Sequence, residues 1–409
     1  MVLGTYIFSV AKWLIDKLAD TDCKCIHFIA RDGFLIKKAY DILAAKSKRR
    51  CPASNYLLTS RTSTMPLMIS SKSDLLALGT VVDFRSYTPV KLIEQLCDII
   101  EPEVYKDREK ILKDNKLIPD RQITTDEEWK DLMSVYAKCF YSEKTINKYR
   151  QTAKQYFEGI FNKGDCTFDI GYSVRSESIF TNLLGYPIDA YYLYYNVERA
   201  VVQAKHAGVK LNAFHDNALV FKNIRITETL LSSTNASFKK YIFKDGKTDL
   251  CFGKPEFSDS EIDMLNTIQD HAVRLVENFV NIFPDEWEFM PYRFTEKAMK
   301  YYLEEASFFD KGPVGSMRSF DALSSINGNQ LINEWTTFSF HDANPVTDSL
   351  ASSNSAKRKE SFFYLLKHDR KTLKENEKAR LASHPVLFKI EKQIYNIGKA
   401  VYRTFRKKG

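Results

Sequence analysis

The feature that most constrains the fold is a short strand-like segment that ends directly at polar residues and is followed by a helix. Residues 25–30 (CIHFIA) run into Arg31-Asp32-Gly33, and apolar residues then recur at helical spacing. Further strand-like segments lie at 56–59, 166–168 and 188–194. Strands that alternate with helices indicate a parallel sheet with crossover helices. The sequence therefore predicts an α/β fold built on a Rossmann-like parallel sheet.

The spacing of these segments suggests how the chain is divided. The stretch between the second and third strands is long, charged and helix-periodic, which predicts a helical insertion that caps the strand ends. A Ser-, Asn- and Gly-rich stretch further on resembles a linker. The predicted regions are 1–71 (first half of the core), 72–160 (helical cap insertion), 161–245 (second half of the core), 246–310 (helical region), 311–356 (irregular linker) and 357–409 (basic helical tail).

Composition and charge exclude several classes of protein. With 409 residues, 44% of them hydrophobic and 27% charged, the chain has the composition of a globular protein. The net charge is +8, but residues 385–409 carry seven basic residues and one acidic residue, so the rest of the chain has a charge of about +2. Nucleic-acid-binding domains usually spread a basic stripe over the folded surface, so we expect no nucleic-acid partner.

The cysteines and the N-terminus favour a cytoplasmic location. The sequence has seven cysteines, and Cys23-Lys24-Cys25 is one residue too close for a zinc knuckle, which favours free thiols in a reducing compartment. The first residues lack the features of a signal peptide. Lys12 and Asp16 interrupt their apolar stretch well short of the roughly 18 residues that a membrane span needs.

The polar strand ends predict one ligand site. In an open parallel sheet, ligands bind beyond the carboxyl ends of the strands, so Asp32 and Asp169 should share a crevice. Helix N-termini and arginine side chains there would favour phosphate, and two carboxylates with a hydroxyl suit Mg²⁺. The alternative is structural, because such an Asp often caps a helix and an Arg such as Arg61 often forms an ion pair. The predicted phosphate- or substrate-binding residues are Arg31, Gly33, Thr59, Ser60, Arg61, Gly171, Ser173 and Arg175.

These segments also resemble a known family. In this order, IHFIARDGFLIKKAYDIL, YLLTSRTS and FDIGYSVRSESIFTNLLG resemble predicted hydrolases of the haloacid dehalogenase (HAD) superfamily. Those proteins occur in bacterial gene clusters for capsule, O-antigen and other surface polysaccharides, often beside or fused to glycosyltransferases. The stretch 226–241 (ITETLLSSTNASFKKY) is similar to their Glu-containing segment after the sheet, so the resemblance spans about residues 1–245.

The resemblance assigns roles to the first strand end. HAD enzymes carry a DxD motif there, in which the first Asp is the nucleophile and a Mg²⁺ ligand and the second is the general acid/base. Asp32 takes the second position, and Ala30 stands where the nucleophile should be. Alanine can neither attack phosphorus nor bind a metal. Many relatives carry a further N-terminal segment with an intact motif, so the resemblance implies a shortened member or one half of a split protein.

The resemblance also covers the other strand ends. Thr59 or Ser60 matches the phosphate-binding hydroxyl, and Asp169 matches the later metal-binding acid. Gly171 replaces the adjacent second acid that the family usually has, and no motif Lys can be assigned. The resemblance therefore implies a Mg²⁺ cofactor held by Asp32 and Asp169, with both as catalytic residues.

Three functions are compatible with these residues. The resemblance implies a phosphohydrolase or phosphotransferase acting on a sugar phosphate or glycan phosphate in surface-polysaccharide biosynthesis. Ala30 favours the alternative, a catalytically inactive HAD-like binding or scaffold protein that partners a glycosyltransferase. Residues 168–173 also loosely resemble the phosphate-binding loop of phosphoribosyltransferases, but lack its two adjacent acids and its Thr-Gly pair.

The C-terminal residues 385–409 form a separate signal. Apolar residues recur there at three- and four-residue spacing, with basic residues between them. A basic amphipathic helix is typical of elements that dock on membranes or partners, so we expect the tail to hold the protein at the inner, anionic membrane surface. The alternative is a last helix that packs on the protein and exposes a basic end.

Overall fold

The computed structural model describes residues 2–81, 84, 87–97, 106–171, 173–195, 197–215 and 224–294, together with 299, 302, 303, 314 and 317. The chain divides into two units, Met1–Thr337 and Phe338–Gly409, and every described residue belongs to the first. The predicted basic tail, including 385–409, and all of the predicted linker except 314 and 317 lie outside the described residues.

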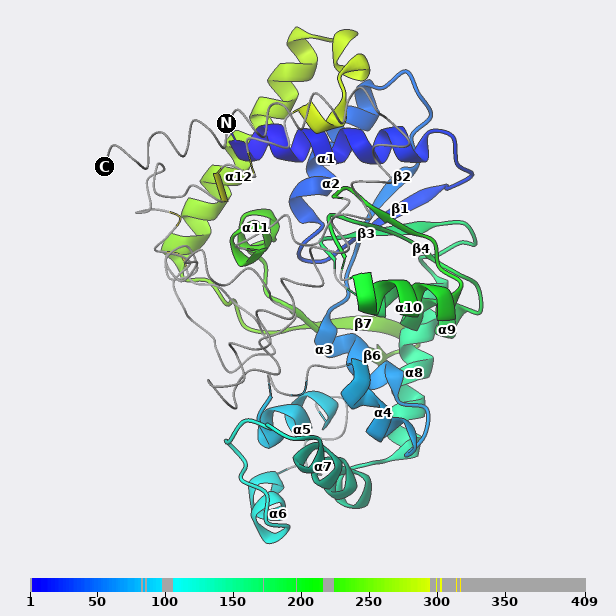
Figure 1. Ribbon diagram of the computed structural model, residues 1–409, viewed down its shortest axis with the longest axis vertical. Helices are drawn as coiled ribbons and strands as arrows, with labels where there is room; N and C mark the ends of the chain where they lie inside the picture. Colours follow the sequence, from blue (N-terminus) through cyan, green and yellow to red (C-terminus); the bar gives the residue numbers. More distant parts are fainter. Residues whose placement is uncertain are drawn as a thin grey trace, which may run out of the picture. The chain divides into compact units, whose positions relative to one another are not determined.

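A parallel sheet forms the centre of the first unit, as the alternation of strands and helices predicted (Figure 1). Its strand order is β2-β1-β3-β4-β5, and each neighbouring pair is parallel. The chain moves from β1 to β2 on one side and then continues on the other, so β1 and β3 border the topological switch point, where ligands bind in such sheets. The strands are β1 Cys25–Ile29, β2 Ala53–Leu57, β3 Cys166–Asp169, β4 Asp189–Tyr192 and β5 Leu211–Ala213.

Helices cover both faces of the sheet (Figure 1). On one face, α1 (Val2–Leu18) packs against α2 (Phe34–Lys46) and α12 (Asp259–Ile282). Most of α1 is buried, and its core side chains include Trp13 and Leu14. Each such side chain contributes about 1.5–3 kcal/mol on burial. Helix α1 is buried nearly all round because it packs against α2 and also against α12, which is far away in the sequence.

The opposite face is covered by the last helix of the stretch predicted as an insertion, 72–160, and by helices that follow later strands. Phe157 and Phe180 from two of these helices pack with Ile29 and Leu57 of the sheet. A smaller cluster joins Tyr192 of β4 to Ala200. The helices concerned are α8 Glu143–Glu158, α9 Arg175–Leu184 and α10 Val197–Ala207.

The stretch predicted as an insertion is helical and has a hydrophobic cluster of its own, which includes Trp129 and Tyr136. The start of α7 (Asp126–Cys139) is well defined, because Thr125 and Glu128 form a reciprocal capping box. The elements from the end of β2 onward are α3 Arg61–Thr64, the 3₁₀ helix Met65–Met68, α4 Asp74–Val81, α5 Pro89–Cys97, α6 Arg108–Asp114 and α7 Asp126–Cys139.

An antiparallel hairpin was not predicted. Strand β6 (Phe238–Lys244) pairs with β7 (Lys247–Phe252), and the hairpin lies between the main sheet and helices α4 to α7 (Figure 1). Its turn is Asp245-Gly246, and both residues have positive φ, 50° and 78°. An Asp-Gly pair between apolar segments is a strong hairpin signal, so this element was readable from the sequence. The remaining described elements are α11 Ile224–Leu231 and the 3₁₀ helices Glu286–Phe289 and Tyr292–Phe294.

One strand was predicted at a displaced position, and one was missed. The second strand was predicted at 56–59, but β2 spans Ala53–Leu57 and only Leu57 in it is fully buried. It is an edge strand, so its residues lack the apolar pattern that marks the central strands. The short edge strand β5 was missed for the same reason, because its three residues are all half-buried.

Candidate functional site

The carboxyl ends of β1 and β3 bring two of the predicted acids together. Phe28 and Phe168 are partners in the parallel register, so the loops that follow the two strands leave the sheet side by side. Asp169 is the last residue of β3, and Asp32 lies in the turn before α2. Their carboxylates are close enough for the charge of Asp32 to affect the protonation of Asp169. The pairing occurs at the switch point of the sheet, where the strand order predicts a ligand site.

Burial and negative charge together raise the pKa of Asp169 well above the usual value for an aspartate. Burial is the larger cause, and the charges of Asp32, Glu177 and Glu228 act in the same direction. The Ile170 backbone N–H donates to Asp169 Oδ1 (2.8 Å), which partly offsets this. The site is therefore a concentration of negative charge at which a cation or a proton is favoured.

Glu177 is an acid that the sequence analysis missed. It is fully buried in α9, where its carboxylate accepts hydrogen bonds from Thr167 Oγ1 (2.7 Å) and from the Tyr192 hydroxyl. Burial raises the pKa of Glu177. A signal for it was present, because Glu177 precedes Phe180 by three residues and so lies on the apolar face of α9.

The turn that follows α11 contacts the Asp32 loop. Ser232 Oγ donates to Asp32 Oδ1 (2.7 Å), and the Ser233 backbone N–H donates to the Arg31 carbonyl oxygen (3.1 Å). The Tyr56 hydroxyl interacts with the Ser233 side chain, and burial raises the pKa of Tyr56 to about 12. The segment 226–241, singled out by the family resemblance, thus forms one wall of the site.

Two of the predicted phosphate-binding groups already have protein partners. Arg31 forms an ion pair with Glu256, whose other carboxylate oxygen accepts a hydrogen bond from Ser237, and the Ala30–Arg31 peptide bond is cis. Ser60 caps α3: its Oγ accepts the Ser63 N–H (3.1 Å), and Ser63 Oγ accepts the Ser60 N–H (2.9 Å). Both side chains therefore have structural partners within the protein, although the structural alternatives considered above concerned the two aspartates and Arg61.

The neighbours of Ser60 differ from it in exposure. Thr59 is 2% exposed, and its hydroxyl makes no well-formed hydrogen bond although it lies near the hydroxyl of Tyr241. Tyr241 instead donates to the Leu58 carbonyl oxygen (3.2 Å). Arg61, the first residue of α3, is exposed. Thr59 is thus the buried polar group at the end of β2, and Arg61 is the accessible one.

The two predicted loop glycines are required by the packing of the protein itself. A Cβ on Gly33 would lie 2.8 Å from the Ile29 carbonyl oxygen. Gly171 has a φ of 142°, and a Cβ there would lie 2.0 Å from the Tyr194 carbonyl oxygen. Close approach of backbone to backbone therefore accounts for both residues, and a ligand contact at either remains a prediction. Ser173 and Arg175, both half-buried, follow Gly171 at the start of α9.

The donor set suits a hard divalent cation only in part. Among the described residues, no group of three or more His, Cys, Asp or Glu side chains is placed to hold a metal ion. Mg²⁺, however, is commonly bound by one or two carboxylates, with water and phosphate oxygens completing its octahedron. Asp32 and Asp169 supply such a pair, and the mutual repulsion that raises the pKa of Asp169 would be relieved by a cation between them.

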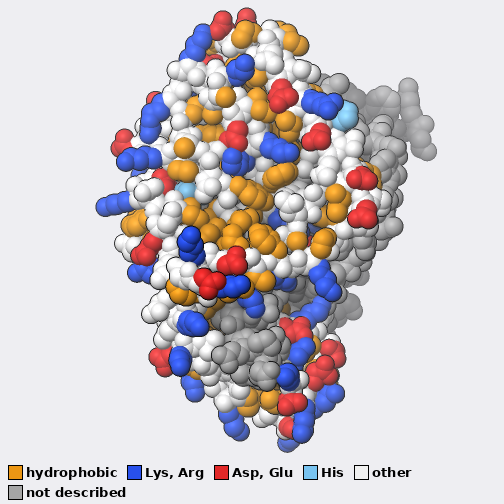
Figure 2. Space-filling model, turned by 180° about the vertical axis from the view of Figure 1, so that it is seen from behind, with side chains coloured by type: hydrophobic (Ala, Val, Ile, Leu, Met, Phe, Trp, Pro, Cys, Tyr) orange, Lys and Arg blue, Asp and Glu red, His pale blue; other side chains and the backbone are white. Residues whose placement is uncertain are grey.

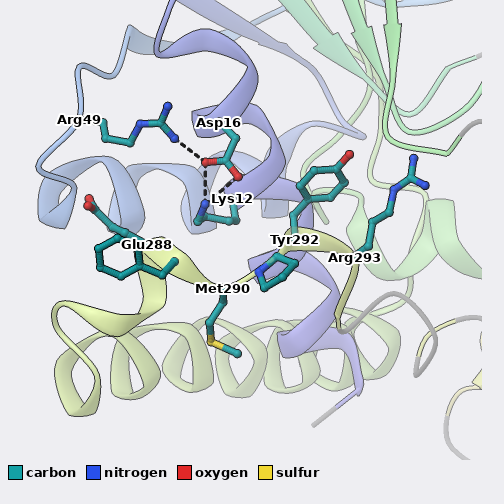
Figure 3. Close-up of a pocket in the computed structure, with 9 residues that line it drawn as sticks. Lys12, Asp16, Arg49, Glu288, Met290, Tyr292 and Arg293 are labelled. Carbon is teal, nitrogen blue, oxygen red and sulfur yellow. Dashed lines mark hydrogen bonds and ion pairs between the residues drawn. The ribbon is translucent and has the colours of Figure 1, made fainter.

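A separate pocket lies beside α1, away from these residues (Figure 3). It has a volume of about 470 Å³, and none of the predicted site residues lines it. Lys12 Nζ donates to both carboxylate oxygens of Asp16 (2.6 and 2.7 Å), and Arg49 donates to one of them (2.8 Å). Lys12 and Arg49 thus each form an ion pair with Asp16. The other lining residues are Glu288, Phe289, Met290, Pro291, Tyr292 and Arg293.

Comparison with known proteins adds no assignment: no family model and no curated protein sequence matches the chain.

Two further observations concern the surface and the helices. Figure 2 shows acidic and basic side chains interspersed over the face behind that of Figure 1. Among the described helices, none combines the length and the apolar composition that crossing a bilayer requires.

Proposed function

We propose that this chain is a HAD-like, Mg²⁺-dependent phosphohydrolase or phosphotransferase that acts on a sugar phosphate or glycan phosphate in cell-surface polysaccharide biosynthesis. The observation that carries the proposal is the pairing of Asp32 with Asp169 at the switch point of the sheet, with Glu228 near enough to add its charge. Clustered carboxylates with a raised pKa are typical of functional sites. The polysaccharide context comes from the family resemblance alone.

Each residue has a role in this proposal. Asp32 and Asp169 hold the cation, and the hydroxyl of Thr59 or Ser60 together with Arg61 holds the phosphate. When bound, the cation offsets the charge that develops on the transferred phosphoryl group. Because Ala30 carries no nucleophile, the attacking oxygen is that of water or of an acceptor hydroxyl, and Asp32 accepts its proton. The new P–O bond forms as the bond to the sugar oxygen breaks, the sugar oxygen leaves with a proton taken from solvent, and Asp32 returns to solvent the proton that it accepted.

A panel of sugar phosphates incubated with Mg²⁺ tests the proposal, with release or transfer of phosphate as the readout. We expect turnover by the wild type and a loss of about 100-fold or more in Asp32→Asn and Asp169→Asn. Asp263→Asn is the matched control, because Asp263 is exposed on α12 and should leave turnover unchanged. Equal activity of wild type and Asp32→Asn would refute the assignment.

The alternative is a non-catalytic scaffold that binds a phosphorylated ligand and partners a glycosyltransferase. One observation favours it, namely Ala30 at the nucleophile position. Binding of a sugar phosphate without turnover, together with a stable complex with a glycosyltransferase encoded nearby, would support this function. A chain that binds neither would count against it.

A location follows from both functions. We propose a cytoplasmic protein that lies at the inner face of the membrane, where lipid-linked glycans are made, and that residues 385–409 contact the anionic lipid surface. The support is the basic amphipathic pattern of that segment. Each basic residue near an anionic leaflet contributes about 1 kcal/mol to binding.

A further inference from the structure

We propose that Ser232 is a positioning residue of the site: its hydroxyl orients the Asp32 carboxylate for the cation. The inference rests on the proposed function, because it concerns the same cation. It adds a residue from a segment 200 positions away in the sequence, in which the family resemblance indicated a glutamate and assigned no role to a serine.

The contact is direct, and its donor is buried while Asp32 is half-buried. Ser232 is 4% exposed, and its Oγ donates to Asp32 Oδ1 across 2.7 Å. A carboxylate rotates about its Cβ–Cγ bond unless a hydrogen bond restrains it. With Oδ1 engaged by Ser232, the plane of the carboxylate is restrained, and with it the direction of Oδ2. Hydrogen-bond partners of carboxylate ligands tune metal affinity in this way.

The turn that carries Ser232 is also hydrogen-bonded to α12. Gln269 of α12 is 1% exposed, and its Nε2 donates to the carbonyl oxygens of Leu230 (3.0 Å) and Ser232 (2.8 Å). On the other side, the Ser233 N–H donates to the Arg31 carbonyl oxygen (3.1 Å). The turn is therefore bonded both to the Asp32 loop and to a long core helix, so the Ser232 hydroxyl has a defined position.

The test is a calorimetric titration of the full chain with Mn²⁺, used as a probe for the Mg²⁺ site. We expect Ser232→Ala to weaken Mn²⁺ binding by about 10- to 100-fold. Ser232→Thr keeps a hydroxyl and should bind Mn²⁺ more tightly than Ser232→Val, which has nearly the same shape and no hydroxyl. Thr234→Val is the matched control from the same turn, because Thr234 Oγ1 contacts Asn266 (3.2 Å) instead of Asp32.

The outcomes separate this inference from the proposed function. If the wild type binds no Mn²⁺, the proposed cation site is wrong, and the role of Ser232 falls with it. If the wild type binds Mn²⁺ and Ser232→Ala binds it equally well, the positioning role alone is wrong. Equal weakening of Mn²⁺ binding in Ser232→Ala and Thr234→Val would also overturn the positioning role, because binding would then depend on the fold of the turn and not on the Ser232 hydroxyl. Should Ser232→Ala fail to fold, the difference between Ser232→Thr and Ser232→Val decides.

Discussion

At the scale of single residues, Asp169 combines burial with nearby negative charge, and this has a consequence for stability. Its pKa is raised in the folded protein, so the folded state holds a proton over a pH range in which the unfolded chain has lost it. The unfolding free energy should therefore fall as the pH rises from the ordinary carboxyl range, near about 4, toward the raised pKa. Burial of Glu177 acts in the same direction.

Asp169→Asn removes the charge of Asp169 and should flatten this dependence. Without divalent cations, we expect the variant to be more stable than the wild type at neutral pH, with the difference vanishing in acid. Urea unfolding at several pH values measures the unfolding free energy of each protein, and Asp263→Asn should show the same dependence on pH as the wild type. An Asp169→Asn profile parallel to that of the wild type would contradict the assignment.

Gly171 provides a test of backbone packing at the same loop. Gly171→Ala combines a φ of 142° with a Cβ that would lie 2.0 Å from the Tyr194 carbonyl oxygen, so we expect a loss of about 3 kcal/mol or more. Gly185→Ala is the matched control, since Gly185 also has a positive φ (79°) but open space around it, and about 1–2 kcal/mol should be lost there. Equal losses in thermal or urea unfolding would show that the contact with Tyr194 is wrong.

Single site residues could be predicted where a local sequence feature marks them, but contacts between residues far apart in the sequence could not. The proximity of Asp32 and Asp169 could be predicted because one lies just beyond the end of a strand and the other at the end of a strand, and strand ends are visible in the local sequence. The partner of Asp32 was not predicted. Ser232 is 200 positions away, and the sequence around either residue does not indicate that the two form a hydrogen bond.

At the scale of elements, Ser60 has a structural role that is separable from ligand binding. It caps α3 in a reciprocal capping box, as Thr125 caps α7. Ser60→Ala and Thr125→Ala should each lower the unfolding free energy by about 1 kcal/mol. If Ser60 also holds phosphate, Ser60→Ala alone should weaken binding of inorganic phosphate in the presence of Mg²⁺. Equal phosphate affinity in the two variants would leave Ser60 as a cap only.

Elements were predicted best where burial leaves a strong pattern. Strands β1 and β3 lie in the centre of the sheet and were located to within a residue or two, whereas the edge strands β2 and β5 were displaced or missed. The hairpin β6–β7 was missed although its Asp245-Gly246 turn is an explicit signal, because only Phe238 and Tyr241 of β6 are buried and its strands show little apolar alternation.

At the scale of the whole molecule, the order of the strands decides the location of the site. An order of β2-β1-β3-β4-β5 places the switch point between β1 and β3, and the residues that follow these strands are the ones that carry Asp32 and Asp169. Local sequence predicts strands, but it does not state which of them become neighbours. The convergence of residues more than 100 positions apart is therefore a property of the topology.

The C-terminal segment belongs to the same scale, because it would determine where the molecule works. We expect the full chain to co-sediment with anionic liposomes and a chain ending at residue 384 to bind them less, with high salt weakening the difference. Neutral liposomes are the control. Equal co-sedimentation of the two chains with anionic liposomes would refute membrane contact through residues 385–409.

If Asp32 and Asp169 form one electrostatic unit, the protonation of Asp169 must respond to the charge of Asp32, and an NMR titration of the Asp169 carboxyl measures this response. In isotope-labelled protein without divalent cations, the Asp169 resonance is identified by its loss in Asp169→Asn. Asp32→Asn removes a negative charge that raises the pKa of Asp169, so we expect a lower Asp169 pKa in that variant and no change in Asp263→Asn. An Asp169 pKa that is the same in the wild type and in Asp32→Asn would show that the two carboxylates are not coupled.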